Sequence, residues 1–334
     1  MFRCVDKGAI VNRTNGSTTG VVMTQSVTQT MSVSLKQGKT RSSAAGLRRA
    51  LRPIYRFVLI TLGVLVGFSL LWEGYKALGQ WTGDRIPFTG IPLPISSSDA
   101  AMPHISTIVG ALFAPTSGAS STTLLSYLLN ELSVTLRESA IGVLIATVVG
   151  CLLAVVLREV KIIERGVLPW LVISQTIPLV ALAPIIVVWM GSAGLPSWVA
   201  VSVIAAYLSF FPIVINMITG LNSPDPVQVE LMRSVSASRI QVLWWLRFPA
   251  SLPYLFIGLR LAAISSVVGA IVGELSAGTG LGIGRAILTA AYYFTNAPEN
   301  LFAAVLVASL GGILFVQIVA LIEFIVLRKR NTNG

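Results

Sequence analysis

Six apolar stretches, each more than 20 residues long, constrain this chain more than any other feature. At 1.5 Å per residue, each is long enough to cross a hydrocarbon core of roughly 30 Å as a helix. A soluble fold could not bury them, because 54% of the residues are hydrophobic and only 11% are charged. Backbone groups in lipid must be paired internally, so an all-α membrane protein is expected. The six predicted spans are about 54–78, 129–157, 167–190, 196–221, 249–275 and 299–327.

Residues 1–50 differ in composition from the rest. Thr, Ser, Gln and Gly dominate, and apolar residues show no periodicity, which predicts a disordered cytoplasmic tail before a membrane domain over 51–330. Gly38-Lys39-Thr40 resembles the end of a phosphate-binding loop, but Val33 stands where such a loop requires glycine. We therefore expect no nucleotide site in this chain.

Basic residues gather in every second connecting segment. The formal net charge of +11 would suit a nucleic-acid partner, but this alternation indicates membrane topology instead. It predicts a multi-pass protein of the cell membrane with both termini in the cytoplasm, bound to lipid and not to nucleic acid. The residues are Arg41, Arg48, Arg49, Arg52 and Arg56 before or at the first span, Arg158, Lys161 and Arg165 after the second, Arg233, Arg239 and Arg247 after the fourth, and Arg328, Lys329 and Arg330 after the sixth.

The polar segment between the fourth and fifth spans is patterned like a short amphipathic helix at about 226–248. Pro224 and Pro226 precede it, its apolar residues recur on one side, and Glu230 and Arg239 lie among its polar residues. Pro249 is expected to end the segment and begin the next span. A structured element on the cytoplasmic side is a natural docking surface for a soluble partner.

This segment resembles the EAA signature of binding-protein-dependent ABC importer permeases. That signature reads Glu, two small residues, three variable ones, Gly, nine more, then Ile-x-Leu-Pro. Here Glu230 and the spacing are kept, Leu231 and Met232 replace the small residues, Ser236 replaces the glycine, and Phe248-Pro249 ends the pattern. Bulkier residues beside the glutamate suggest a fit adjusted to this chain's own ATPase.

Further passages, in order from about residue 50 to the C-terminus, are similar to the nitrate/sulfonate/taurine group of these permeases. They are Gln175-Thr176-Ile177-Pro178 with Ala181-Leu182-Ala183-Pro184, Phe210-Phe211-Pro212, Leu252-Pro253-Tyr254 with Gly258-Leu259-Arg260-Leu261-Ala262, and Gly269-Ala270-Ile271-Val272-Gly273-Glu274 with Gly280-Leu281-Gly282.

The resemblance implies a type I ABC importer permease fold that works as a dimer, preferably of identical copies. It implies an ABC ATPase subunit below, a solute-binding protein outside, and alternating access driven by ATP hydrolysis elsewhere. The solutes of the group and its close relatives are sulfonates, nitrate, taurine, bicarbonate and pyrimidine or flavin precursors, and the choice among them stays open. The residues expected to couple to the ATPase are Glu230, Ser236, Ala237, Arg239 and Pro249.

Four further residues are candidates for the translocation pathway: Glu274, Arg260, Gln175 and Pro178. A charged side chain within a span is costly in lipid and must face water or a partner. Arg260 has two interpretations: it forms an intramolecular ion pair or caps a carbonyl, or it contacts a gate of the pathway. Glu274 also has two: it lies at the outer end of the pathway, or it only marks the membrane surface.

Two other protein classes fit less well. An ion-coupled secondary transporter is the alternative, but it usually carries several ionisable groups deep in its spans. An enzyme would need a polar constellation, and the single histidine, His104, lies in a Pro/Ser-rich loop. Cys4 and Cys151 suggest neither a disulfide nor a metal site, so we expect no catalytic residue, metal or cofactor.

Overall fold

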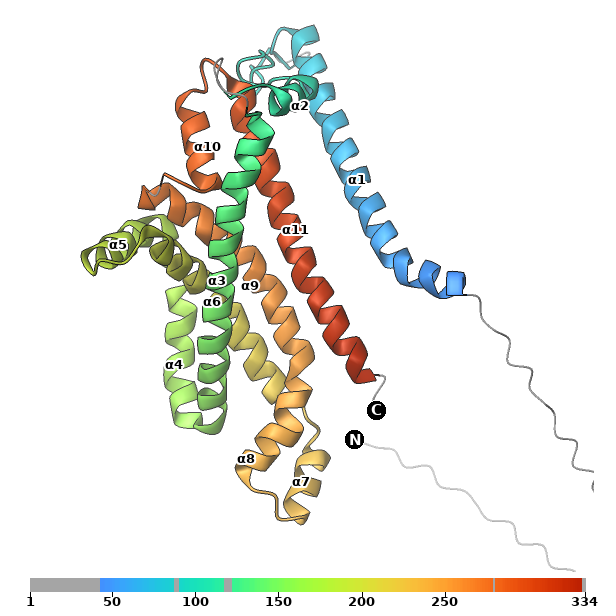
Figure 1. Ribbon diagram of the computed structural model, residues 1–334, viewed down its shortest axis with the longest axis vertical. Coiled ribbons are helices and arrows are strands. Elements are labelled where there is room, and N and C mark those ends of the chain that lie inside the picture. Colours follow the sequence, from blue (N-terminus) through green and yellow to red (C-terminus); the bar gives the residue numbers. More distant parts are fainter. Residues whose placement is uncertain (1–42, 87–89, 117–121, 279, 332–334) are drawn as a thin grey trace, which may run out of the picture. The chain divides into compact units, whose positions relative to one another are not determined.

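The computed structural model describes residues 43–86, 90–116, 122–278 and 280–331, and within these ranges the side chains of residues 59–328. The described residues form helices and connecting segments, with two isolated β-bridges. The helices are α1 (Ser43–Thr82), α2 (Ile105–Phe113), α3 (Leu124–Glu159), α4 (Lys161–Ser174), α5 (Leu179–Ser192), α6 (Ser197–Leu221), α7 (Pro226–Ser234), α8 (Arg239–Val242), the π-helix η1 (Leu243–Arg247), α9 (Phe248–Ala277), α10 (Ile283–Tyr292) and α11 (Pro298–Asn331) (Figure 1).

The chain forms two compact units, Met1–Gly63 and Val64–Gly334. In the first unit the structure describes only the beginning of α1. The predicted tail 1–50 therefore lies largely outside the described residues, and its last part, from Ser43, is helical. Apart from the span Leu59–Thr82, which begins in the first unit, all further description concerns the second unit.

Five helices among the described residues are long and apolar enough to cross a membrane: Leu59–Thr82, Leu124–Glu159, Ser197–Leu221, Arg239–Ala277 and Pro298–Arg328. Each overlaps a predicted span. The pair α4 and α5 makes a sixth candidate if it counts as one span, but it is bent by 101°. The all-helical membrane fold is thus confirmed, and the third predicted span differs in being broken.

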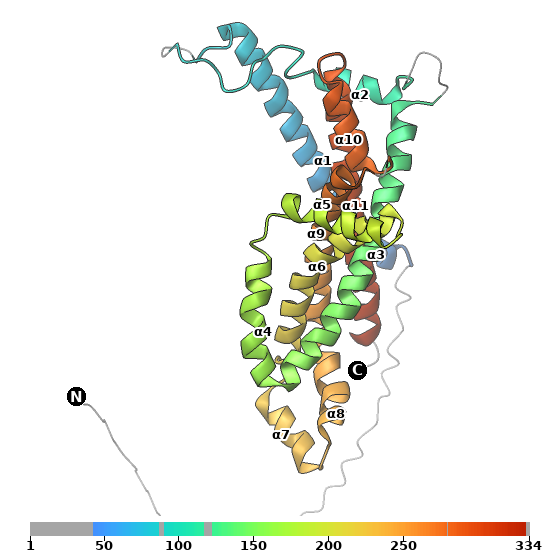
Figure 2. The ribbon, with the colours of Figure 1, turned by 90° about the vertical axis from the view of Figure 1, so that its left-hand side faces the viewer.

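The break between α4 and α5 has a local cause in proline. Pro178 caps the start of α5 and restricts the residue before it to extended conformations, so the helix cannot continue through this point. The hydroxyl of Tyr207 on α6 donates to the carbonyl of Ser174, which the break leaves without a helical partner. As a result α5 turns away from the direction of α4 (Figure 2).

Helices α3, α6 and α9 pack closely because small residues meet where they cross. A Cβ atom on Gly142 of α3 would lie 2.6 Å from the Cβ of Ala205 on α6, and one on Gly269 of α9 would lie 2.9 Å from the Ala205 Cα. Such contacts let helix backbones approach in a membrane, where the hydrophobic effect does not drive helices together. The buried Ser209 hydroxyl adds a hydrogen bond of 2.9 Å to the carbonyl of Ala262, across α6 and α9.

Two apolar clusters lie toward opposite ends of this bundle. Near one end, Leu157 of α3 packs with Met217 and Leu221 of α6, and the α7–α8 segment (residues 226–247) lies beyond them. At the other end, Leu128 of α3 packs with residues of α2, α10 and α11. We call these the α7–α8 end and the α2–α10 end (Figure 1).

Candidate functional site

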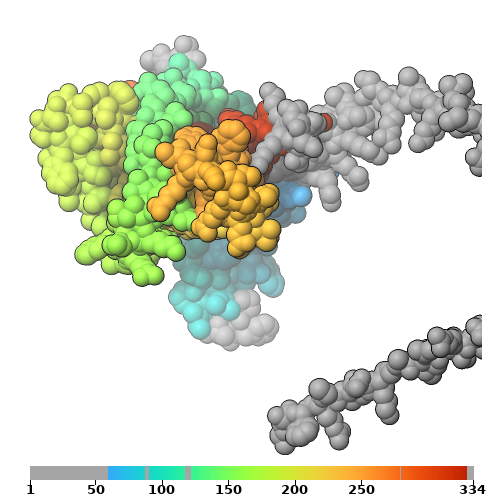
Figure 3. Space-filling view, turned by 90° about the horizontal axis from the view of Figure 1, so that it is seen from below, coloured from blue at the N-terminus to red at the C-terminus, as the bar shows by residue number. Residues whose placement is uncertain are grey.

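The α7–α8 segment is a helix–turn–helix whose two starts are set by local sequence. Asp225 caps α7 by accepting from the Val227 amide at 2.9 Å, and Pro226 fits the first turn, where no amide donor is needed. Ser238 and Gln241 form a reciprocal capping box at the start of α8, with distances of 2.7 and 3.3 Å. The segment stands out at one end of the molecule (Figure 3).

Ser236 occupies the turn between α7 and α8 with a left-handed backbone, φ +57°. It follows the end of α7, and its amide donates to the carbonyl of Arg233 at 2.9 Å. Glycine adopts this conformation at least cost, so the geometry gives a physical reason for the glycine that the EAA signature carries at this position. Serine keeps the turn at the expense of local strain.

The α7–α8 segment presents an unusual surface for a short connector. Glu230 is exposed and makes no ion pair with any residue that the structure describes. Large apolar side chains of the same segment are also exposed: Leu231 by 65%, Val235 by 69% and Ile240 by 70%. Arg239 is exposed and Ala237 is half-buried, and these two predicted coupling residues belong to the segment as well.

Pro249 lies within a continuous helix and does not separate the segment from the next span. Helices α8, η1 and α9 follow one another without a gap from Arg239 to Ala277. In a regular α-helix the Pro249 ring would clash with the carbonyl of Trp245 four residues earlier. The wider π-helical turn of η1 accommodates the ring at this point. Arg247 then ties η1 to α6, donating to the Leu221 carbonyl at 2.8 Å.

The predicted pathway residues Gln175 and Pro178 lie at the break between α4 and α5. Both are exposed in the single chain. Non-helical backbone at membrane depth is tolerated only inside protein or beside water, because lipid cannot pair its polar groups. At this break the Gln175 amide donates to the Val172 carbonyl and the Pro178 carbonyl accepts from Ala181, so these backbone groups are paired within the chain. The exposed polar group is the Gln175 side chain, which is costly in lipid and favours contact with water or protein.

Arg260 lies elsewhere, in an ion pair. Its Nε is 2.6 Å from Oε2 of Glu323 on α11, the intramolecular pair that the sequence analysis weighed against a gate contact. Arg260 is half-exposed in the single chain, whereas Glu323 is largely covered.

Glu274 is 1% exposed and belongs to a cluster at the start of α10. Gly282 gives α10 no side-chain cap, so its first amide groups need acceptors from elsewhere. Side chains of α3 and α9 supply them. The bonds are Gly282 N to Glu131 Oε2, Ile283 N to Thr135 Oγ1 at 2.8 Å, and Gly284 N to Glu274 Oε2 at 2.6 Å. Carboxylates at a helix N-terminus are also favoured by the helix dipole.

The sequence analysis missed the α3 members of this cluster. Glu131, Thr135 and Glu138 are buried on one face of α3, at the four- and seven-residue spacing that should have revealed them. Glu138 lies beside Glu274. Oε2 of Glu138 and Oε1 of Glu274 are buried, and the two carboxyl groups interact with each other.

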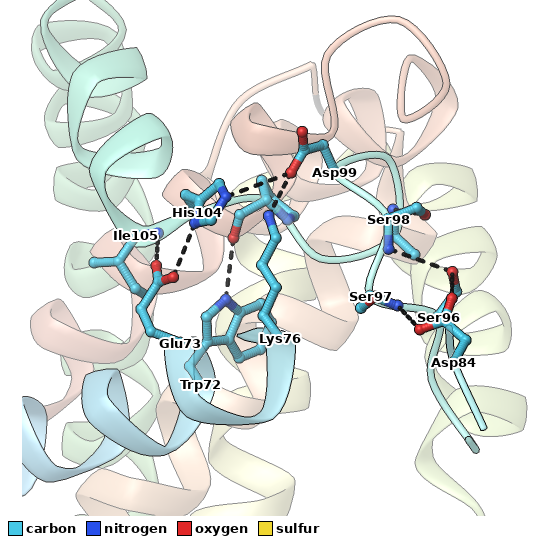
Figure 4. A network of polar contacts seen from close by, with 12 residues as sticks. Trp72, Glu73, Lys76, Asp84, Ser96, Ser97, Ser98, Asp99, His104 and Ile105 are labelled. Atoms are coloured by element: carbon cyan, nitrogen blue, oxygen red, sulfur yellow. Dashed lines mark hydrogen bonds and ion pairs between the residues drawn. The ribbon is translucent and has the colours of Figure 1, made fainter. Parts of the chain in front are cut away.

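At the α2–α10 end, the connection between α1 and α2 is held by a polar network (Figure 4). Glu73 of α1 accepts from the Ile105 amide and contacts His104 Nδ1, both at 2.8 Å. Lys76, whose side chain is buried, pairs with Asp99. His104 therefore has a structural role in this network.

Two aspartates of this connection have lowered pKa values. Hydrogen bonds from the Ser97 side chain and amide, and from the Ser96 hydroxyl, lower the pKa of Asp84. The hydrogen bond and charge of Lys76 lower the pKa of Asp99. Both carboxylates are thus stabilised in the ionised form by the folded connection.

The sequence of this chain matches a known family of transport proteins over a region that contains the broken span and the α7–α8 segment. The model of the family "Binding-protein-dependent transport system inner membrane component" matches residues 146–328, more than half of the chain.

Individual proteins that resemble the chain are also transport permeases. The chain is 39% identical over 207 residues to the formylaminopyrimidine transport permease protein of Halalkalibacterium halodurans, covering 61% of this chain and 79% of that protein. It is 40% identical over 125 residues to the riboflavin transport system permease protein of Chloroflexus aurantiacus, covering 37% of this chain and 45% of that protein. Identity to the putative aliphatic sulfonates transport permease protein of Bacillus subtilis is 26% over 205 residues, 61% of this chain and 72% of that protein. The chain therefore belongs to the family of binding-protein-dependent transport system inner membrane components, the permease subunits of ABC importers.

Proposed function

We infer that this permease couples to its ATPase subunit through the α7–α8 segment, with Glu230 as the main polar contact. The family assigns the chain to ATP-driven import of a small solute and not to an enzyme or an ion-coupled transporter. The observation that carries the coupling role is the exposed surface of Glu230 with Leu231, Val235 and Ile240. Apolar side chains of this size, exposed next to an unpaired carboxylate, suit a protein interface.

The distribution of arginine residues indicates how the protein is oriented in the membrane. Arginines cluster at the α7–α8 end, in the last turn of α3, in α7 and in η1, which favours this end for the cytoplasm. Both termini are then cytoplasmic, and the solute-binding protein docks at the α2–α10 end. A topology test follows: reporter fusions after Arg330 and within 88–104 should report opposite sides, and the same side for both would overturn this orientation.

We assign the break between α4 and α5 to the translocation pathway of a homodimer. Gln175 and Pro178 are exposed in one copy, and the polar side chain of Gln175 is costly to place in lipid. A second copy of the chain facing this break would enclose a water-filled path between them. Arg260 and Glu274 then act indirectly, because they hold α11 and α10 to α9, and α9 contacts α5.

For the solute we propose a nitrogen heterocycle such as a pyrimidine or flavin precursor. The matched pyrimidine and riboflavin permeases are 39% and 40% identical to this chain, whereas the sulfonate permease is 26% identical. Uptake of labelled pyrimidine and riboflavin, compared with alkanesulfonate, by cells with and without this permease tests the choice. Uptake of only the sulfonate would contradict it.

A charge reversal tests the coupling role. With the permease, its ATPase and its binding protein in proteoliposomes, Glu230→Lys should abolish ATP-dependent uptake and weaken copurification of the ATPase, while membrane insertion stays normal. Glu164→Lys is the matched control, because Glu164 lies in the first turn of α4 at the same end but outside the α7–α8 segment. Normal uptake by Glu230→Lys would exclude Glu230 from coupling.

A further inference from the structure

A pocket of about 380 Å³ lies at the α7–α8 end, between the last turn of α3 and the α7–α8 segment. Its charged lining consists of four arginines and one glutamate. They are Arg158 and Glu159 of α3, Arg233 of α7, Arg239 of α8 and Arg247 of η1. The pocket belongs neither to the break between α4 and α5 nor to the carboxylate cluster at α10.

Among the described residues, the four arginines share the pocket lining with one carboxylate, Glu159, so positive charge is in excess there. None of the four arginines forms an ion pair with a residue that the structure describes. Nε of Arg158 is buried and has no hydrogen-bond partner there. Arg247 donates one N–H group to the Leu221 carbonyl. Arg158 and Arg233 lie close enough to repel its charge, and Glu159 lies close enough to attract it. A buried guanidinium nitrogen without a partner is costly unless an anion completes its hydrogen bonds.

The place of the pocket in the bundle indicates where the anion comes from. Arg158 lies in the last turn of α3, Leu221 ends α6 and Arg247 directly precedes α9, so the pocket lies at one end of three helices that are long and apolar enough to cross a membrane. On the same helix Trp244 is 58% exposed and Trp245 is 78% exposed. Tryptophans are enriched at the level of lipid headgroups.

We propose that this pocket binds a phosphate group, supplied by the headgroup of an anionic phospholipid of the cytoplasmic leaflet. Arginine matches phosphate with paired hydrogen bonds, and basic pockets between spans on the cytoplasmic side suit such headgroups. Inorganic phosphate has the same chemistry and is the second source. The bound phosphate joins the end of α3 to α7 and α8, and so holds the α7–α8 segment against the bundle. The inference rests on the proposed orientation and coupling role of that segment.

The test uses the purified full-length permease in a neutral detergent. Its thermal unfolding midpoint is followed during titration with dihexanoyl-phosphatidylglycerol, the zwitterionic dihexanoyl-phosphatidylcholine, inorganic phosphate and a glutamate-rich peptide. We expect a saturable rise with phosphatidylglycerol and little with phosphatidylcholine. The double variant Arg158→Gln, Arg233→Gln should weaken the apparent affinity about ten-fold or more, since each glutamine removes charge-assisted hydrogen bonds to the phosphate.

Two further variants keep the result interpretable. Arg233→Gln alone changes an exposed residue and guards against misfolding of the double variant. Arg165→Gln is the control, because it removes the same charge at the same end from an exposed position outside the pocket lining.

Each result of the titration supports or overturns the proposal. Saturable binding of phosphatidylglycerol supports the lipid source, and binding of inorganic phosphate alone supports the free anion. The proposal is overturned if neither phosphate compound binds, if Arg165→Gln loses as much affinity as the pocket variants, or if only the acidic peptide binds. Because no ATPase is present, a negative result here leaves the Glu230 experiment standing. Normal transport by Glu230→Lys, in turn, would not alter this titration.

Discussion

Nε of Arg260 lies 2.6 Å from Oε2 of Glu323, so a salt bridge joins α9 to α11 within two membrane spans. Removing either partner leaves an unpaired charge in the bundle. Arg260→Met and Glu323→Met should each lower the free energy of unfolding by about 2–3 kcal/mol. The double variant should lose less than either single change, because two apolar side chains replace the pair. Thermal unfolding of all four proteins in detergent measures the coupling, and additive losses would mean that the pair is not formed.

The left-handed backbone of Ser236 predicts the effect of glycine. Ser236→Gly should leave the protein as stable or stabilise it by up to about 1 kcal/mol, whereas Ser236→Val should destabilise the turn by about 1–2 kcal/mol. Ser234→Gly is the control, because Ser234 is helical and glycine should cost about 1 kcal/mol there. Limited proteolysis of the α7–α8 segment measures the relative stability of these variants. Equal protection of Ser236→Gly and Ser236→Val would contradict the positive φ.

The cluster at α10 predicts different results from two changes at Glu274. Glu274→Gln keeps an oxygen that can accept from the Gly284 amide, so the midpoint of thermal unfolding should change little. Glu274→Ala leaves that buried amide unpaired and should lose roughly 1–3 kcal/mol. Gly282→Ala should be at least as harmful, since its φ is +99° and a Cβ would lie 2.2 Å from the Glu274 Cδ. A tolerated Gly282→Ala together with a harmful Glu274→Gln would show that Glu274 acts through its charge.

The connection between α1 and α2 should loosen in acid. The folded state lowers the pKa of Asp84 and of Asp99 below the ordinary 3.8, so their stabilisation is present above about pH 4 and is lost as pH falls through the lowered values. Hydrogen–deuterium exchange of residues 95–105, corrected for the intrinsic effect of pH, should rise below pH 4. The double variant Asp84→Asn, Asp99→Asn should exchange faster than the unaltered chain in residues 95–105 at neutral pH as well. Exchange that is independent of pH in the unaltered chain would contradict this account.

The sequence predicts the membrane class and most spans because length and apolarity alone decide which helices can cross lipid. It also locates the α7–α8 segment, whose prolines, caps and spacing are local signals. The break at Gln175–Pro178 is harder to predict, since proline within a span bends some helices and leaves others continuous. Pro249 shows the converse: a local rule predicts a stop, but the π-helical turn of η1 lets the helix continue.

The polar contacts between helices could not be predicted from the sequence for a different reason. The ion pair of Arg260 and Glu323 joins residues far apart in the chain, so neither predicts the other. Glu131 and Glu138 read as ordinary polar residues near the start of a span until the amide groups of α10 are placed beside Glu131. The arginine pocket likewise gathers residues from four elements, and their meeting depends on how α3 ends against α7, α8 and η1.

Helices α8, η1 and α9 form one unbroken helix from Arg239 to Ala277, so α8 is joined to the long helix α9 without a loop between them. Under the proposed coupling role, a shift of α8 would act directly on α9, because η1 continues the helix and Arg247 donates to the end of α6. At the far end of α9, Glu274 accepts from the first turn of α10. A movement applied at one end of the bundle would then reach α10 at the opposite end along one continuous helix.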